Sequence, residues 1–169
     1  MKRIFLICTA SLITSITSNA QESTELPSVT IETIDGKPFD TKDLSNDGKP
    51  MIINFWATWC GPCKLELSNI NEVYYDWIDE TGVKLVAVSI DDSRTRSRVK
   101  PYIDTQGWEY EVYIDPNGDF RRAMNVGNPP FTFLIDGNGK VVYKHTGYSA
   151  GDEEELYEKL LELQEQEEE

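Results

Sequence analysis

The chain has 169 residues and a formal net charge of −14, with 30 acidic against 16 basic side chains. This length suits one ordinary domain, and a composition that is 39% hydrophobic and 11% aromatic predicts a packed core rather than a disordered chain. A surface this acidic repels nucleic acid and anionic membrane surfaces, so we expect neither as a partner.

The N-terminus is typical of a cleaved signal peptide. Lys2 and Arg3 precede a mostly apolar stretch over residues 4–16, and Ser18-Asn19-Ala20 supplies the small residues at which a signal peptidase cuts. We predict that residues 1–20 are removed and that residues 21–169 form one domain in the periplasm or another extracytoplasmic compartment. A buried N-terminal helix is the alternative. The remaining chain holds no stretch apolar enough to span a membrane.

Strands and helices alternate along the rest of the chain. Apolar or alternating runs predict the strands, and longer periodic or polar runs predict the helices. In chain order we expect strand 29–34, strand 51–56, helix 62–81, strand 83–90, helix 93–105, strand 109–114, helix 119–125, strand 131–135, strand 141–145 and helix 152–164. This order predicts an α/β fold, with a central mixed sheet flanked by helices on both faces.

The chain has three cysteines, and their positions separate them. Cys8 lies inside the predicted signal peptide, where it is a poor lipid-anchor site because little apolar sequence precedes it. Cys60 and Cys63 are three residues apart, so a disulfide between them closes almost no loop and stabilises little through chain entropy. This spacing indicates redox chemistry. A structural disulfide and a zinc site are the alternatives. A structural zinc site commonly needs four Cys or His ligands, and besides Cys60 and Cys63 the chain after residue 20 offers only His145.

The cysteine pair lies where strand 51–56 ends and the helix starting at Pro62 begins. A helix N-terminus offers free N–H groups and a partial positive charge, which favour a thiolate. We therefore expect the pKa of the Cys60 thiol to fall below its ordinary value of about 8.5, which makes Cys60 the attacking sulfur. Cys63 is expected to be less exposed and to resolve the mixed disulfide by attacking Cys60.

The segment from Phe55 to Cys63, with its two tryptophans and Cys-Gly-Pro-Cys, resembles the active-site segment of thioredoxins. From about Leu26 to Leu163 the chain is similar to the exported branch of that superfamily, the TlpA/ResA-like thiol–disulfide oxidoreductases. The loop 48–50, the run 63–66 and the segment 130–139 match that branch. The resemblance implies a thioredoxin-like fold in which the helix and strand between residues 93 and 114 are an insertion.

The resemblance also implies a substrate groove beside the two sulfurs. Pro130 would follow a cis peptide bond and face the sulfurs, and the groove would include Trp59, Gly61, Pro62 and Pro129. A trans proline at the start of a strand is the alternative. Pro129 departs from the family pattern, because a proline has no N–H to donate to a substrate strand.

A carboxyl group close to the pair is the second implied feature. Glu66 would be a semi-buried acid that takes the proton that Cys63 must lose, and a solvated glutamate is the alternative. Asn54 stands where cytoplasmic thioredoxins carry a buried Asp, and an asparagine cannot take a proton. Of the two tryptophans in the motif, we expect Trp59 to be exposed and Trp56 to belong to the core.

Two polar segments outside the motif have plainer interpretations. Asp91-Asp92-Ser93 is expected to cap helix 93–105. The basic cluster that follows is interpreted as a solvated face, with a docking patch as the alternative; it consists of Arg94, Arg96, Arg98 and Lys100.

The resemblance implies a reductase of disulfides in exported proteins, including the cysteines of apocytochrome c before haem attachment in cytochrome c maturation. A membrane thiol carrier of the DsbD or CcdA type would re-reduce the protein, which we expect to be a monomer with no cofactor beyond the Cys60–Cys63 pair and no metal. Cys-Gly-Pro-Cys favours reduction, because thioredoxin lies near about −270 mV and the oxidant DsbA near about −120 mV. A thiol oxidase or isomerase, and a non-catalytic redox-sensing binding module, are the alternatives.

Overall fold

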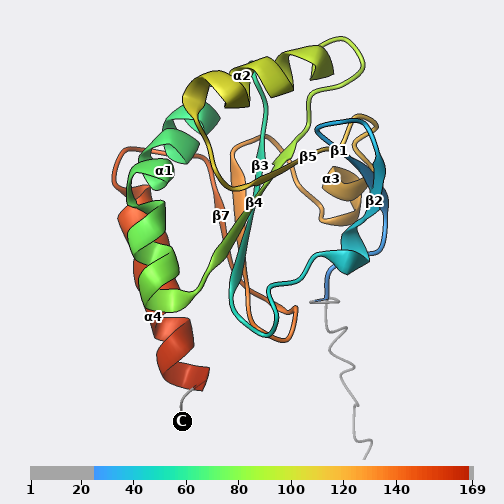
Figure 1. Ribbon diagram of the computed structural model, residues 1–169. Coiled ribbons are helices and arrows are strands. Elements are labelled where there is room, and N and C mark those ends of the chain that lie inside the picture. Colours follow the sequence, from blue (N-terminus) through green and yellow to red (C-terminus); the bar gives the residue numbers. More distant parts are fainter. Residues whose placement is uncertain (1–24, 168–169) are drawn as a thin grey trace, which may run out of the picture.

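The computed structural model describes residues 25–167, so the predicted signal peptide lies outside the described residues (Figure 1). In this part of the chain a seven-stranded sheet has the order β2-β1-β5-β4-β3-β6-β7. The elements are β1 (Thr30–Thr33), β2 (Pro38–Asp40), a 3₁₀ turn (Thr41–Asp43), β3 (Met51–Trp56), α1 (Gly61–Thr81), β4 (Lys84–Ser89), a second 3₁₀ turn (Arg96–Arg98), α2 (Val99–Gln106), β5 (Glu111–Ile114), α3 (Asp119–Ala123), β6 (Phe131–Ile135), β7 (Val141–Thr146) and α4 (Asp152–Glu167).

The sheet is mixed, as the order of elements predicted. β3 pairs in parallel with β4, and β4 pairs in parallel with β5. The other neighbouring strands pair antiparallel. Every residue of β3 is buried, which fits the continuous apolar run from which this central strand was predicted.

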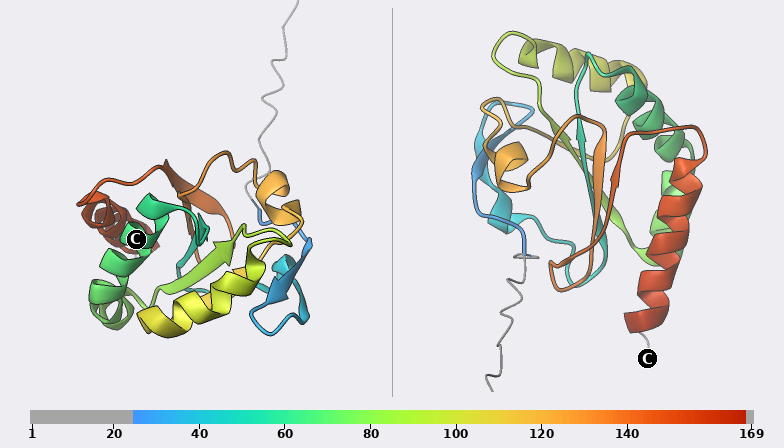
Figure 2. Two further views of the ribbon diagram at one scale, coloured as in Figure 1. Left: turned by 90° about the horizontal axis from the view of Figure 1, so that it is seen from above. Right: turned by 180° about the vertical axis from the view of Figure 1, so that it is seen from behind.

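Helices cover both faces of the sheet, and β3 shows which helix lies where. Neighbouring residues of a strand point to opposite faces. Phe55 packs on Phe120 of α3, with ring centroids 5.2 Å apart, whereas Trp56 packs on Tyr102 of α2 at 5.8 Å. The face that carries α2 also carries α1 and α4, which lie side by side, and α3 lies on the other face (Figure 2). No helix within residues 25–167 is long and apolar enough to cross a membrane.

Helix α1 is the longest helix in the described part of the chain, and it presents the cysteine pair. It starts directly after Cys60 and runs 21 residues without interruption. At its end Gly82 takes a left-handed conformation (φ 65°) and donates its N–H to the carbonyl of Ile78, which stops the helix as expected of a C-terminal glycine. The helix therefore fixes Cys60 at the edge of the sheet where β3 ends.

The helix predicted at residues 93–105 is wrong in its start. The chain instead makes a turn and a 3₁₀ turn, and α2 begins only at Val99. The carboxylate of Asp92 accepts the N–H of Arg94 at 3.0 Å, a local bond that competes with helix formation. Pro101 has the same effect, because a proline is tolerated only in the first turn of a helix. α2 and β5 together form the insertion that the family resemblance implied.

Candidate active site

Cys60 and Cys63 form a disulfide at the N-terminus of α1, with Cα atoms 5.4 Å apart. Cys60 occupies the N-cap position in an extended conformation, and its Sγ accepts the N–H of Cys63 at 3.3 Å. Pro62 fits the first turn because its missing N–H would have no helical partner there. Cys60 is 6% exposed and Cys63 is fully buried, so the expected difference in exposure between the two sulfur-bearing residues is confirmed.

The two tryptophans of the motif differ in burial as expected. Trp56 is fully buried at the end of β3. Trp59, next to the disulfide, is 55% exposed. An exposed aromatic ring beside a reactive sulfur gives a docking polypeptide an apolar surface to contact.

The peptide bond between Pro129 and Pro130 is cis, as the resemblance implied. Pro130 is buried and Pro129 is half-buried. Phe131, the next residue, pairs with Phe55 in the antiparallel register of β6 and β3. One step further along this register, Pro130 lies beside the end of β3 from which the cysteine loop departs, so the proline and the cysteine pair share one end of the sheet.

Glu66 is a buried carboxyl group one turn beyond Cys63, only 3% exposed. Asn54 of β3 donates its Nδ2 to Glu66 Oε2 at 2.9 Å. Thr132 of β6 donates its hydroxyl to Glu66 Oε1 at 2.8 Å. Asn54 Nδ2 also donates to Thr132 Oγ1 at 2.8 Å, which closes a triangle of three side chains from three elements. Glu66 is therefore not the solvated glutamate of the alternative interpretation.

Burial raises the pKa of Glu66 from 4.5 to about 7. The hydrogen bonds from Thr132 and Asn54 act in the opposite direction but do not cancel the loss of solvation. His145 lowers this pKa through its charge and Asp152 raises it, and these two residues lie close together, with His145 Nε2 3.3 Å from Asp152 Oδ2. Glu66 can therefore exchange a proton near neutral pH.

One polar atom of the triangle has no partner among the described residues. The Oδ1 atom of Asn54 is buried and has no hydrogen-bond partner. A protonated carboxyl group becomes a donor, and the two ends of an asparagine amide are a donor and an acceptor of the same shape. A half-turn of the Asn54 amide would turn Oδ1 toward a protonated Glu66, but it would also take Nδ2 away from Thr132 Oγ1. The arrangement seen here is therefore the one that binds the carboxylate.

Sequence reasoning missed the role of Asp91, which was interpreted as a helix cap. Asp91 is fully buried, and its carboxylate accepts both the N–H and the hydroxyl of Thr58, at 2.8 and 2.7 Å. It also accepts the hydroxyl of Ser89 at 2.8 Å. Asp91 thus holds the loop that leads to Cys60 against the end of β4. Its position directly after a buried parallel strand, the edge where sites of open sheets gather, was the signal available in the sequence.

The family model named Redoxin matches residues 21–161, which is most of the chain. The chain belongs to the redoxin family. This redoxin is 35% identical over 137 residues to "Thiol-disulfide oxidoreductase ResA" of Bacillus thuringiensis (strain Al Hakam), a match that covers 81% of this chain and 76% of the relative. The predicted thiol–disulfide exchange activity is confirmed by this family and this relative.

Solved structures confirm the thioredoxin-like fold. A thioredoxin-like protein from Porphyromonas gingivalis is 57% identical, with a TM-score of 0.74, over 83% of this chain and 92% of that chain. A putative thiol:disulfide interchange protein DsbE from Chlorobium tepidum is 29% identical, with a TM-score of 0.71, over 82% of this chain and 94% of that chain.

Proposed function

We propose that this redoxin reduces disulfides in exported proteins through Cys60 and Cys63. The observation that carries the proposal is the cysteine pair at the N-terminus of α1 with cis-Pro130 beside it at the same end of the sheet. The signal-peptide pattern of residues 1–20 supports an extracytoplasmic location. The disulfide of apocytochrome c, whose reduction gives the thiols needed for haem attachment, is one substrate that fits, and the Cys60–Cys63 pair is the only redox group that the proposal needs.

The chemistry proceeds by two exchanges of sulfur. In the reduced protein the Cys60 thiolate attacks one sulfur of the substrate disulfide, and the other substrate sulfur leaves as a thiolate. Cys63 then loses its proton and attacks Cys60 Sγ, which forms the Cys60–Cys63 disulfide and releases the second substrate thiolate. Two electrons have passed to the substrate, and the protein is left in the oxidised state seen here.

Glu66 supports the second exchange. Cys63 is fully buried, so bulk water is a poor acceptor for its proton. Glu66 is buried one helical turn along α1, where residues three apart are neighbours, and its pKa of about 7 suits proton transfer near neutral pH. In the proposed role Glu66 takes the proton of Cys63 directly or through a water molecule.

The oxidised pair must be re-reduced by a dithiol donor. We propose a membrane thiol carrier of the DsbD or CcdA type, acting on a monomeric enzyme. The reverse exchange would start with attack of the donor thiolate on Cys60, because Cys60 is the more exposed sulfur-bearing residue of the pair. Substrate and donor would therefore use the same groove in turn.

Trapping with cysteine variants tests the proposal. Cys63→Ser should accumulate a mixed disulfide with a protein or peptide substrate, because Cys60 can attack but nothing resolves the product. Cys60→Ser is the matched control and should accumulate much less, since Cys63 is buried. Non-reducing gel electrophoresis and mass spectrometry measure the adduct. A binding module would instead hold its partner without a covalent bond in both variants, and that result would refute the proposal.

The direction of electron flow has a separate test, the reduction potential of the Cys60–Cys63 pair measured in glutathione and dithiothreitol buffers. We expect a value near or below about −230 mV, in the range of the known reducing thiol–disulfide proteins. A value above about −170 mV would make the protein an oxidase or isomerase, and the exchange chemistry would stand.

A further inference from the structure

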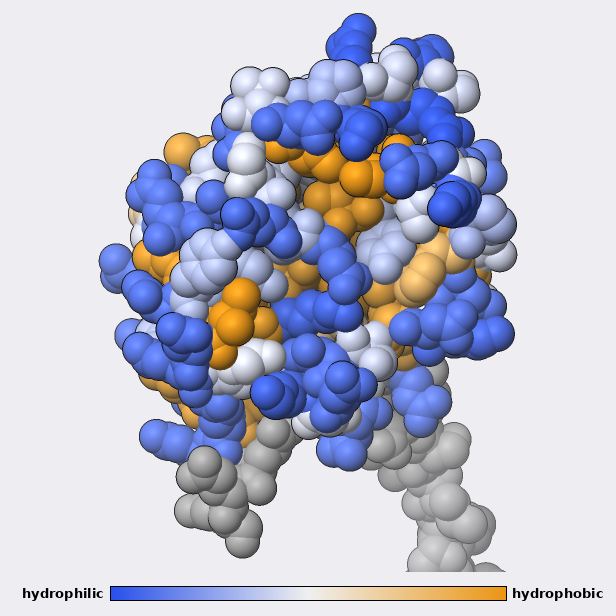
Figure 3. All heavy atoms as spheres, in the orientation of Figure 1, coloured by the Kyte–Doolittle hydropathy of each residue, from blue (hydrophilic) through white to orange (hydrophobic). Residues whose placement is uncertain are grey.

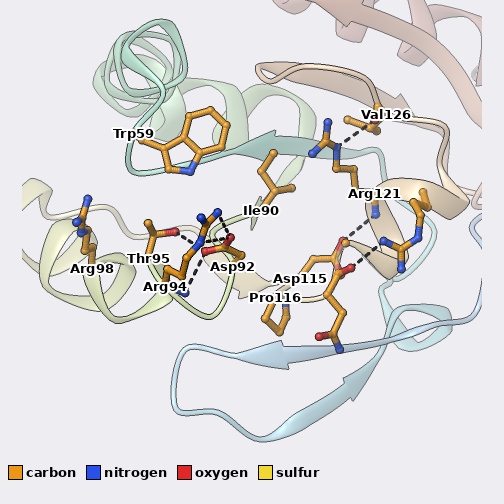
Figure 4. Close-up of a pocket in the computed structure, with 13 residues that line it drawn as sticks. Trp59, Ile90, Asp92, Arg94, Thr95, Arg98, Asp115, Pro116, Arg121 and Val126 are labelled. Carbon is orange, nitrogen blue, oxygen red and sulfur yellow. Dashed lines mark hydrogen bonds and ion pairs between the residues drawn. The ribbon is translucent and has the colours of Figure 1, made fainter.

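A cavity of about 790 Å³ opens beside the active-site tryptophan (Figure 4). Trp59, Ile90, Pro116 and Val126 contribute apolar surface to its lining. Trp59 directly precedes Cys60, and Val126 lies on the segment that leads to cis-Pro130. The cavity therefore adjoins the groove in which a polypeptide would lie while it exchanges with Cys60.

The lining of this cavity is cationic, although the chain as a whole is acidic. Four arginines against two aspartates give it a formal excess of two positive charges: Arg94, Arg98, Arg121 and Arg122 with Asp92 and Asp115. In the whole chain acidic side chains outnumber basic ones by 30 to 16, so a cationic cavity is not a by-product of composition.

Both aspartates of the cavity already have partners. Asp92 binds Arg94 at 2.6 Å. Asp115 is buried, and its two carboxylate oxygens accept the backbone N–H groups of Asp119 and Arg121, each at 2.8 Å. Asp92 therefore offsets the charge of Arg94, whereas Asp115 keeps its negative charge, because backbone N–H groups hold it in place without cancelling it.

Two of the arginines have no carboxylate partner among the described residues. Arg98 is exposed, and its guanidinium group makes no hydrogen bond or ion pair with any residue between 25 and 167. Arg121 donates from its guanidinium group to the carbonyls of Val126, at 3.2 Å, and Gly127. Backbone carbonyls hold this side chain in place without cancelling its charge. The two arginines approach the cavity from different elements, Arg98 from the turn before α2 and Arg121 from α3 (Figure 4).

A guanidinium group binds a carboxylate through two parallel hydrogen bonds. Trp59 and Ile90 line the same cavity and offer apolar surface to the methylene groups of an acidic side chain. We propose that this cavity binds an aspartate or glutamate of the polypeptide that exchanges disulfides with Cys60, at a position close to the reactive cysteine of that polypeptide. The inference rests on the proposed function, because it assigns part of the substrate specificity of the same site.

Paired peptide substrates test the inference. Two disulfide-linked peptide dimers, identical except for Glu or Gln two residues from the cysteine, are reduced by the reduced protein at about 0.15 M salt, where charges beyond about 8 Å are screened. We expect the second-order rate constant of this single exchange to be about threefold higher for the Glu peptide than for the Gln peptide, the scale of one exposed ion pair. Arg98→Gln should bring this ratio to about one.

Lys100→Gln is the matched control, because it removes one positive charge from the same segment at a residue that does not line the cavity. It should leave the ratio of the two rate constants unchanged. An equal fall of the ratio in both variants, or a ratio of one or less in the unmodified protein, would overturn the inference and leave the proposed function standing. Failure to reduce either peptide would overturn the proposed function as well.

Discussion

Glu66 is a buried acid whose hydrogen-bond donors are neutral. Its pKa therefore differs between the folded protein and the unfolded chain. Its pKa rises from 4.5 in the unfolded chain to about 7 in the folded protein. Between these two values the folded protein retains a proton that the unfolded chain has released. The free energy of unfolding must therefore fall as the pH rises through this window, and the loss is complete above the folded pKa.

Glu66→Gln should escape this loss, because a glutamine does not titrate. We expect the free energy of unfolding of the variant, relative to the unmodified protein, to rise by up to about 3 kcal/mol between about pH 4 and about pH 8. Urea unfolding of the oxidised proteins measures it. Glu72→Gln, an exposed position on the same helix, is the control and should show no such trend. A difference between Glu66→Gln and the unmodified protein that is independent of pH would contradict the raised pKa.

At the scale of elements, the β6–β7 hairpin packs its turn against the loop before β3. A Cβ atom added at Gly137 would lie 2.1 Å from the carbonyl oxygen of Gly48, a backbone atom that cannot move alone. We expect Gly137→Ala to lower the free energy of unfolding by about 2 kcal/mol, because the two turns must separate. Chemical unfolding measures it.

Gly127 provides the control for this substitution. A Cβ atom there would meet no heavy atom within 4 Å, and the residue is not in the left-handed region. Gly127→Ala should change the free energy of unfolding by less than about 0.5 kcal/mol. Equal losses in the two variants would show that the close approach at Gly137 is not what the hairpin requires.

The elements that the sequence predicted well are those whose limits are set by their own residues. β3 is a run of apolar residues interrupted only by Asn54, and α1 has a cysteine N-cap at one end and Gly82 at the other. The start of α2 was wrong, because Asp92 forms local hydrogen bonds that replace the first turns of a helix. The three-residue strand β2 was not predicted, since so short a segment shows no periodicity.

The candidate site was predictable only where its residues are close together in the sequence. The cysteine pair is one motif. The triangle of Asn54, Glu66 and Thr132 joins residues up to 78 positions apart, and no local pattern indicates that β6 delivers a hydroxyl to α1. Asp91 was misinterpreted for the same reason, because its partner Thr58 lies 33 positions away on a different loop. Sheet topology, rather than sequence spacing, brings these groups together.

At the scale of the whole molecule, repulsion among the many negative charges lowers the free energy of unfolding. The face of the molecule seen in Figure 3 is largely hydrophilic, with apolar surface showing below α2 and in a smaller patch at the lower left. In α4 the acidic residues of the first turn, Asp152 to Glu155, lie at the positive end of the helix dipole, where a negative charge is stabilising. Glu162 and Glu165, nearer the other end, have no such benefit. Lys159 pairs with Glu162 at 2.7 Å, while Glu165 has no ion pair among the described residues.

Salt should therefore stabilise this protein. Raising NaCl from about 0.01 M to about 1 M shortens the screening length from about 30 Å to about 3 Å, which weakens repulsion within a chain of charge −14. We expect the urea midpoint to rise over this range. At low salt, Glu165→Gln should raise the free energy of unfolding by up to about 0.5 kcal/mol and the urea midpoint with it. Both gains should vanish at high salt. Any effect of salt on hydrophobic burial would be the same in the unmodified protein and in Glu165→Gln, so it cancels in the difference between them. If Glu165→Gln remained more stable than the unmodified protein at high salt, charge repulsion at the end of α4 would not be the source of its gain in free energy of unfolding. A midpoint that falls with salt would mean that the ion pairs of the surface outweigh its net charge.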